Sequence, residues 1–181
     1  MDDIARELGM SKKTLYVHFK DKKDLIMKVV TGYLSYHQAQ MEEIFSKKLN
    51  AIEELFEIYN KNKDELSEMK PMVLFELRKY YPEAWKRYDS FKRSYIPSCV
   101  EENLNRGKKE GLYRKNLNSR IIAIAYTNLM NLILESDQFG EKEFDFKTLY
   151  LELFYYHIRG IASNKGNEYI EELHKKMGLS K

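Results

Sequence analysis

The chain contains little of what several large classes of protein depend on. Cys99 is the only cysteine among 181 residues, so no intramolecular disulfide and no multi-cysteine zinc site can form. This usage fits the reducing cytosol, and a lone cysteine is expected to be a packing residue. The N-terminus, Met-Asp-Asp, lacks the basic and apolar regions of a signal peptide. We therefore expect a cytoplasmic protein.

A long apolar run is missing as well. The most apolar stretch, residues 121–134, is fourteen residues long and is interrupted by Thr127, Asn128 and Asn131. It is too short and too polar to cross a bilayer. No run alternates apolar and polar residues with the β-branched enrichment of a strand, and no internal repeat is present. The sequence therefore predicts an all-α protein without a membrane partner.

Recognisable catalytic and metal-binding patterns are absent. The sequence has no HExxH motif, no glycine-rich phosphate loop and no Ser, His and Asp set in a recognisable local context. His37, His157 and His174 have no nearby partners at ligand spacing, so we interpret them as structural or surface residues. We expect no metal, no cofactor and no enzyme, since an enzyme would need a catalytic set assembled from scattered residues.

The charge of the whole chain says little about its partners. Thirty-one lysines and arginines against 28 aspartates and glutamates give a net charge of only +3. The local pattern is more informative, because residues 9–28 contain six lysines against Asp21 and Asp24. Such a basic patch is usually a solvated surface. Its position around a predicted turn is what makes this basic patch a candidate for binding nucleic acid.

The N-terminal residues predict a short helix, a glycine turn and a second short helix. Ile4, Ala5 and Leu8 form a one-sided apolar stripe only on a helix. Gly9 follows directly, where a helix C-terminus prefers a residue that tolerates the left-handed conformation. Ser11 stands at an N-cap position, because its hydroxyl can accept a hydrogen bond from an otherwise unpaired backbone N–H.

The second of these helices has two distinct sides. Leu15 and Phe19 lie one turn apart and share a face. At 100° per residue, the opposite side carries Lys13, Tyr16, Val17 and Lys20. A helix with aromatic and basic groups on its exposed side, entered by a tight turn, is what a helix-turn-helix presents to the major groove of DNA.

These residues carry a family resemblance. The DNA-binding domain of the tetracycline-repressor (TetR) family resembles the run Ile4-Ala5-x-x-Leu8-Gly9-Met10-Ser11-x-x-Thr14-Leu15-Tyr16-x-His18-Phe19-x-x-Lys22. Its most specific part is Thr-Leu-Tyr-x-His-Phe, and the rest of the chain is similar only in its all-helical layout. The resemblance also implies a helix ahead of these two, packed behind them, which the printed sequence does not include. Either the start codon was chosen too far downstream or the domain is shortened.

The resemblance assigns DNA-binding roles to seven positions. Groove-facing positions of the family correspond to Lys12, Lys13 and Tyr16. Phosphate-contacting positions correspond to Thr14, His18 and Lys22, and the helix N-terminus at Ser11 offers N–H groups to an anion. Lysine can donate to guanine, and tyrosine offers a ring and a hydroxyl. The competing interpretations are helix packing for the aromatic residues and solvated helix ends for the lysines.

Further helices are predicted along the rest of the chain, at residues 22–47, 50–61, 64–69, 72–80, 82–106, 120–136, 146–163 and 168–177. Pro97 should kink or divide the helix at 82–106. Glu53, Glu54 and Glu57 are expected mostly on the wet side of their helix. We expect a helix-turn-helix head at 1–45, incomplete at its N-terminus, and a helical effector-binding and dimerisation domain at 46–181.

Fourteen tyrosines and nine phenylalanines exceed what packing alone requires. A pocket lined by aromatics is a common small-molecule site, although aromatics at helical spacing more often belong to a core. The candidate ligand-binding residues are Tyr59, Phe75, Tyr88, Tyr95 and Tyr126.

The TetR resemblance implies a transcriptional regulator with three partners: double-stranded palindromic DNA, a small-molecule effector, and a second copy of the chain. The effector would release a repressor from its operator. The homodimer would form through the helices near 120–136 and 146–163, which could instead both lie inside a monomer core. The alternative function is a helical ligand-binding dimer that has lost DNA binding.

Overall fold

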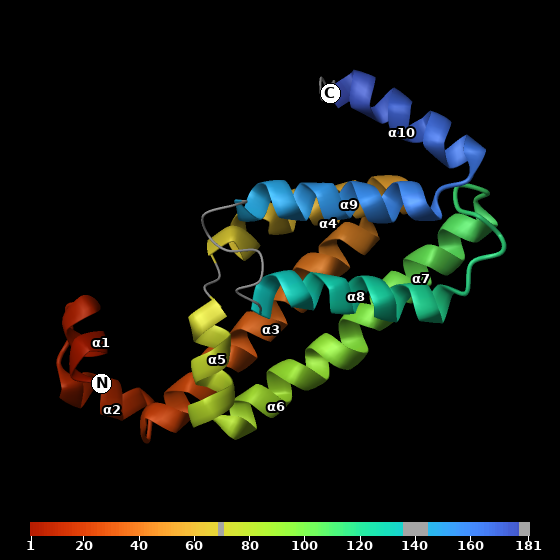
Figure 1. Cartoon of the computed structure of the whole chain (residues 1–181). Coiled ribbons are helices and arrows are strands. Elements are labelled where there is room, and N and C mark those ends of the chain that lie inside the picture. Colours follow the sequence, from red (N-terminus) through yellow and green to blue (C-terminus); the bar gives the residue numbers. More distant parts are fainter. Residues whose placement is uncertain (69–70, 136–144, 178–181) are drawn as a thin grey trace.

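The computed structural model describes residues 1–68, 71–135 and 145–177, and these form an all-helical chain without a named strand (Figure 1). The helices are α1 (Asp2–Glu7), α2 (Lys12–His18), α3 (Lys22–Ser46), α4 (Ala51–Glu68), α5 (Pro71–Tyr80), α6 (Pro82–Ser90), the π-helix η1 (Phe91–Tyr95), α7 (Ile96–Lys109), α8 (Ser119–Glu135), α9 (Phe146–Ile161) and α10 (Asn164–Met177). The all-α prediction is confirmed. None of the described helices combines the length and apolar character needed to cross a membrane.

Side-chain caps fix where several helices begin. Asp21 Oδ1 accepts a hydrogen bond from the Asp24 N–H at 2.9 Å and starts α3. Asn118 Oδ1 accepts from the Ile121 N–H at 3.1 Å at the start of α8. Each bond satisfies a backbone donor that has no partner inside the helix. Asp21 and Asn118 thus cap the starts of α3 and α8.

Two helices differ from their predicted extents. α4 continues through the predicted break and absorbs the short helix expected at residues 64–69. α10 begins at Asn164 and includes Gly166, which we expected to lie outside it. A Cβ on Gly166 would lie 2.0 Å from the backbone oxygen of Leu112. The glycine is therefore required by a close approach between chain segments, and it does not stop the helix.

The predicted division at Pro97 takes the form of a π-helix. α6, η1 and α7 follow one another as a single long rod (Figure 1), in which the Ile96 N–H bonds to the Phe91 oxygen, five residues back. Proline lacks a backbone donor and its ring crowds the carbonyl four residues earlier. One wider turn immediately before Pro97 accommodates both effects without ending the rod.

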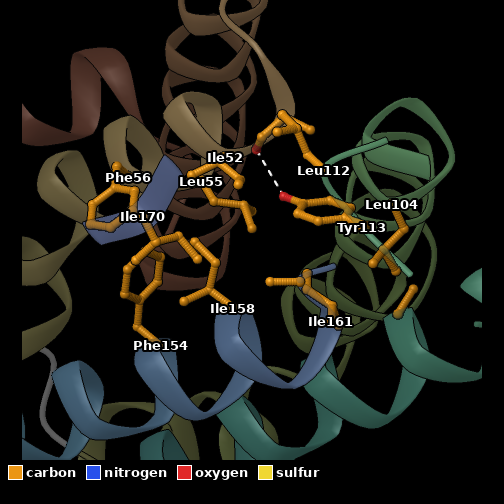
Figure 2. Close-up of a cluster of buried hydrophobic side chains, with 13 residues drawn as sticks. Ile52, Leu55, Phe56, Leu104, Leu112, Tyr113, Phe154, Ile158, Ile161 and Ile170 are labelled. Atoms are coloured by element: carbon orange, nitrogen blue, oxygen red, sulfur yellow. Dashed lines mark hydrogen bonds between the residues drawn. The ribbon is translucent and has the colours of Figure 1, made fainter. Parts of the chain in front are cut away.

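The main core lies between α4, α7, α9 and α10. Figure 2 shows Ile52, Phe56, Ile158 and Ile170 converging there, with Tyr113 at one side. A second buried cluster joins Val30 and Leu34 of α3 to Leu74 and Leu77 of α5 and to Ala84 and Tyr88 of α6. Because α3 contributes to this cluster, the helix that follows the N-terminal pair is also part of the body.

One predicted surface residue is buried. Glu54 has only 2% of its surface exposed, so its assignment to the wet side of α4 was wrong, whereas Glu53 and Glu57 are partly exposed. Glu54 accepts a hydrogen bond from Asn103 Nδ2 at 2.8 Å and forms an ion pair with Arg106. A buried carboxylate needs such partners, and they lie about fifty residues away, beyond the reach of local sequence patterns.

Candidate DNA-binding head and ligand cavity

The two N-terminal helices meet at a tight glycine turn. Gly9 has φ +63°, the left-handed conformation that its position predicts, and the Met10 N–H bonds to the Ala5 oxygen at 2.9 Å. Leu15 of α2 is 2% exposed and Ala5 of α1 is 4% exposed. They are the buried side chains of α1 and α2. Figure 1 places the pair at one end of the molecule, with α3 leading from it into the body.

The N-terminus of α2 is built as predicted around Ser11. Its Oγ accepts from the Thr14 N–H at 3.0 Å and lies 2.8 Å from Thr14 Oγ1. Lys12 Nζ lies 2.9 Å from Asp2 Oδ2, which joins α2 to α1. The hydrogen bond from Lys12 lowers the pKa of Asp2, and both side chains are exposed. Lys12 therefore has a carboxylate neighbour that any phosphate or base would have to displace.

The remaining predicted DNA contacts face outward. Lys13 and His18 are exposed, as is Tyr16 at 47%. Lys22, at the start of α3, is exposed too. Lys13 and Lys22 form no salt bridge with any other described residue, so both ammonium groups are available to an anionic partner.

A lysine that the sequence did not single out fixes the junction of α2 and α3. Lys28 Nζ donates to the His18 backbone oxygen at 2.9 Å and to Asp24 Oδ2 at 3.1 Å, and it lies 5.2 Å from the centre of the Phe19 ring. A hydrogen bond from the Lys20 N–H, followed by that from Lys28, lowers the pKa of Asp24. The Asp24–Lys28 spacing of four residues was the available signal, but it marks many ordinary surface pairs.

The body contains a cavity of about 200 Å³ lined by residues of α3, α4, α6, η1, α7, α8 and α9. Four of the five predicted ligand residues, Tyr59, Tyr88, Tyr95 and Tyr126, line it together. Phase along the helices explains why: these aromatics lie on the inner sides of α4, the α6–α7 rod and α8. Ligand binding at these four positions stays a prediction.

Phase also places Phe75 away from this cavity. It is 59% exposed on α5 and does not line the cavity, so the structure does not bring it together with the other four candidates. Leu74 and Leu77 fill the buried face of α5, and the next residue after Leu74 points about 100° away from it. Abundance of aromatics along a helix does not by itself indicate which of them face inward.

The polar groups of the cavity are few. Lys92 of η1, which the sequence analysis did not identify, lines it together with His37, whose Nε2 lies 2.9 Å from Glu65 Oε1. Cys99 lines it too, and burial raises the pKa of its thiol, so the side chain is protonated. Within the described parts of the chain, no three His, Cys, Asp or Glu side chains are grouped to hold a metal ion.

Comparison with known proteins agrees with the geometry of the head. Residues 1–29 match the family model described as "Bacterial regulatory proteins, tetR family". The HTH-type transcriptional regulator YvaF of Bacillus subtilis, itself uncharacterised, is 26% identical over 138 residues, or 76% of this chain and 72% of YvaF. The chain carries a TetR-family head. It is a TetR-family transcriptional regulator with the all-helical architecture described above.

Solved structures share the fold of this TetR-family chain. A transcriptional regulator from Cytophaga hutchinsonii matches with a TM-score of 0.70 and 18% identity, covering 90% of this chain and 88% of that one. FadR of Bacillus subtilis in complex with stearoyl-CoA matches with a TM-score of 0.66 and 20% identity, covering 87% of this chain and 86% of that one. The ketosteroid regulator KstR2 of Mycobacterium tuberculosis matches with a TM-score of 0.64 and 16% identity, covering 90% of this chain and 84% of that one.

Apolar side chains of α8, and one aromatic side chain of α9, are exposed in this TetR-family regulator. Ile121 is 62% exposed, Ile124 and Leu132 are each 40% exposed, and Tyr156 of α9 is 74% exposed. The other sides of the same helices are buried in the body, as Ala123 and Ile158 show. Neither helix is therefore entirely a core helix. Together the four exposed side chains form what we call the α8–α9 face.

The stability of the body should depend on pH through His157. Burial lowers the pKa of His157 from 6.5 to about 4, and its ring stacks on Tyr126 at 3.8 Å between ring centres. As the pH falls below 6.5 the unfolded chain takes up this proton first, so stability is lost down to about pH 4. The total loss is about 3 kcal/mol.

Urea unfolding of the wild type and of His157→Phe at pH 7.5 and pH 4.5 measures this effect. Phenylalanine keeps the stacking and removes the proton, so the variant should lose less stability between the two pH values. His174, whose pKa burial also lowers, contributes equally to both proteins. Equal pH dependence of the two proteins would contradict the assignment to His157.

Proposed function

We propose that this TetR-family chain is a homodimeric repressor that a small-molecule effector releases from a palindromic operator. The observation that carries the proposal is the position of α3. It begins directly after the exposed face of α2, and its residues Tyr33, His37 and Met41 line the cavity. One continuous helix thus connects the candidate DNA contacts with the candidate effector site.

The DNA contacts follow from the exposed groups of the head. We assign groove contacts to Lys13 and Tyr16, and also to Lys12 once it leaves Asp2. We assign phosphate contacts to Ser11, Thr14, His18 and Lys22. Phosphate contacts fix the register of the protein on the duplex, whereas base contacts read its sequence.

The dimer follows from the α8–α9 face. Apolar side chains grouped on one face of two neighbouring helices are normally covered by a partner. A two-fold axis there would pair α8 and α9 with their copies in a four-helix bundle. The two heads would then read half-sites about 34–36 Å apart, which is one turn of DNA.

Release requires that the effector prefer the conformation that does not match the operator. The effector can shift the equilibrium only by its difference in affinity for the two conformations. A ligand in the cavity touches α3, so it can move the heads through that helix. We retain a head at 1–45 and an effector and dimerisation domain at 46–181, with α3 shared structurally between them.

Substitutions in the head should separate sequence reading from affinity. Lys13→Ala or Tyr16→Ala should reduce discrimination between the operator and single-base variants by about tenfold or more. Lys22→Ala should weaken binding to all sequences and reduce the slope of log affinity against log salt by about one. Lys86→Ala, at an exposed lysine of the body, is the matched control and should change neither.

Fluorescence anisotropy against duplexes selected from the DNA upstream of the gene measures both quantities. The titration uses the printed chain and, where the coding DNA continues in frame upstream of Met1, the longer chain. If neither binds a palindrome in that DNA, the repressor function is wrong. If all three substitutions cause an equal loss of specificity, the division of roles is wrong.

One observation favours the alternative function, a ligand-binding dimer that has lost DNA binding. Leu8, which the sequence places in the apolar stripe of α1, is 58% exposed, and Met10 beside it is 38% exposed. Apolar surface on the head lowers the stability of the α1–α2 pair relative to the body. Effector binding without DNA binding by either form of the chain would establish this alternative.

A further inference from the structure

We infer that the cavity takes an uncharged, ring-sized apolar ligand with one carbonyl oxygen, which accepts a hydrogen bond from Tyr126 or Tyr150. This inference rests on the ligand-responsive function proposed above and names the chemical class of the ligand. Three features of the cavity support it: the size and apolar character of its walls, the partners that its ionic groups already have, and the buried hydroxyls that lack a hydrogen bond.

The walls and volume define the body of the ligand. Aromatic and aliphatic side chains from six α-helices and η1 make up most of the lining. The ring centre of Tyr59 lies 4.9 Å from that of Tyr150 and 4.7 Å from that of Phe154, so aromatic rings already pack face to face along one wall. An apolar cavity of about 150 Å³ is enough to hold benzene. At about 200 Å³ this cavity suits one or two fused rings.

The ionic groups around the cavity already have partners. Lys92 is the only Lys, Arg, Asp or Glu among the described residues that line it. Its Nζ lies 3.9 Å from Asp89 Oδ1 and 5.3 Å from the ring centre of Trp85, neither of which lines the cavity. His37 has the Glu65 carboxylate at 2.9 Å. A charged ligand would lose its water without gaining a free counter-ion, which is costly.

Other titratable groups at the cavity are uncharged near neutral pH. Burial raises the pKa of the Cys99 thiol and of the Tyr126 hydroxyl, so both keep their protons. Burial also lowers the pKa of His157, whose ring stacks on Tyr126, to about 4. These side chains therefore offer no charge that would offset the charge of a ligand.

Two hydroxyls supply the polar contact. Tyr126 of α8 and Tyr150 of α9 both line the cavity, and neither hydroxyl bonds to another described residue. Tyr150 is only 4% exposed, and burial, followed by the neighbouring Tyr126, raises its pKa. Buried tyrosine hydroxyls usually have a hydrogen-bond partner. Because both hydroxyls are protonated, a carbonyl oxygen on the ligand would supply the missing acceptor.

Asn62 of α4 adds an adaptable group beside these hydroxyls. Its Oδ1 is buried and has no partner in the described chain. It follows Tyr59 by three residues, so both lie on one side of α4, and Tyr59 stacks on Tyr150. Either end of the Asn62 amide can be turned to a ligand. The unused polar groups thus gather on the walls formed by α4, α8 and α9, and the rest of the lining suits the apolar body.

Equilibrium dialysis of four naphthalene probes against the full chain, without DNA and at pH 7.5, tests the inference. The probes are the ketone 2-acetonaphthone, its hydrocarbon isostere 2-isopropenylnaphthalene, the anion 2-naphthoate and the cation 2-naphthylmethylammonium. All four carry the same ring body, so differences in affinity report the polar group. The ketone should bind about 10- to 100-fold more tightly than either charged probe, because the cavity leaves their charges unpaired.

Variants locate the hydrogen bond. Tyr126→Phe or Tyr150→Phe should lower the ratio of ketone affinity to hydrocarbon affinity by about 3- to 10-fold, because one donor is lost while the apolar walls remain. The hydrocarbon is measured on the same variant, so a change in cavity shape cancels in the ratio. Tyr80→Phe, at an exposed tyrosine of α5, should leave the ratio unchanged. Circular dichroism checks folding, and if neither cavity variant folds, the wild-type comparison of ketone with charged probes decides.

The inference is overturned if a charged probe binds as tightly as the ketone, if folded Tyr126→Phe and Tyr150→Phe both keep the wild-type ratio, or if the ketone does not bind below about 1 mM. These outcomes are distinct from a failure of the proposed function. A ketone that binds through these hydroxyls but leaves operator affinity unchanged would contradict the repressor mechanism and support the ligand class.

Discussion

Tyr113→Ala should destabilise the chain by at least about 4 kcal/mol, a large share of the stability of an ordinary domain. Tyr113 is 1% exposed, and a Cβ on Gly107 would lie 2.1 Å from its ring, so no neighbouring side chain could fill the space. Its hydroxyl donates to the Ala51 oxygen at 2.9 Å (Figure 2). It also lies 3.0 Å from Asn103 Oδ1. Removal of the ring leaves a void and deletes both hydroxyl contacts, although the Ala51 oxygen keeps a hydrogen bond from Asn103 Nδ2 at 3.0 Å.

Two companion variants separate these contributions. Tyr113→Phe keeps the ring and should cost about 1–2 kcal/mol, because only the hydroxyl contacts are lost. Tyr36→Ala, at a tyrosine that is 57% exposed, should change stability by less than about 0.5 kcal/mol. Urea denaturation followed by far-UV circular dichroism measures all three. If Tyr113→Ala were no less stable than Tyr113→Phe, the ring would not be the support that we describe.

Tyr156→Asp should convert the proposed dimer to a folded monomer and abolish tight operator binding. In the dimer, two introduced carboxylates would be buried near the symmetry axis of the α8–α9 face, where an unpaired charge costs several kcal/mol. A monomer holds one half-site only and loses the gain from joining two heads, which is about 100-fold or more. Ile124→Asp should act in the same way from α8.

Analytical ultracentrifugation at micromolar concentration, together with anisotropy on the selected operator, measures this effect. Tyr80→Asp, at a tyrosine of α5 that is 54% exposed, introduces the same charge away from the face and should leave the dimer intact. Unfolding curves confirm that the monomer is folded. If Tyr156→Asp and Ile124→Asp both sediment as dimers, the α8–α9 face is not the interface.

Local chemistry explains which features were predictable from the sequence. Gly9, Ser11 and Asp21 act within four residues of themselves, and the turn and the caps follow from their side chains alone. The break near Pro97 was predictable for the same reason, although not that it would be a π-helix. The tyrosines of the cavity were found because helical phase and aromatic content happened to coincide at those positions.

The features that escaped prediction depend on contacts between distant segments. Gly166 resembles a helix stop until Leu112 is seen against it, and Glu54 resembles a surface residue until Asn103 and Arg106 are placed beside it. Lys92 lies in a sequence of ordinary surface character, yet it is only 7% exposed. Such positions are decided by packing, which a single sequence does not reveal.

The junction between α4 and the C-terminal part has a consequence for synthesis. Ala51 accepts from Tyr113, Tyr169 OH donates to Glu53 Oε1 at 2.6 Å, and Ile170 is fully buried in the main core. During translation, α4 leaves the ribosome long before Tyr169 and Ile170 exist. The apolar side chains of α4 therefore stay exposed to solvent until α10 has been synthesised. The head is therefore made first, but its scaffold is completed last.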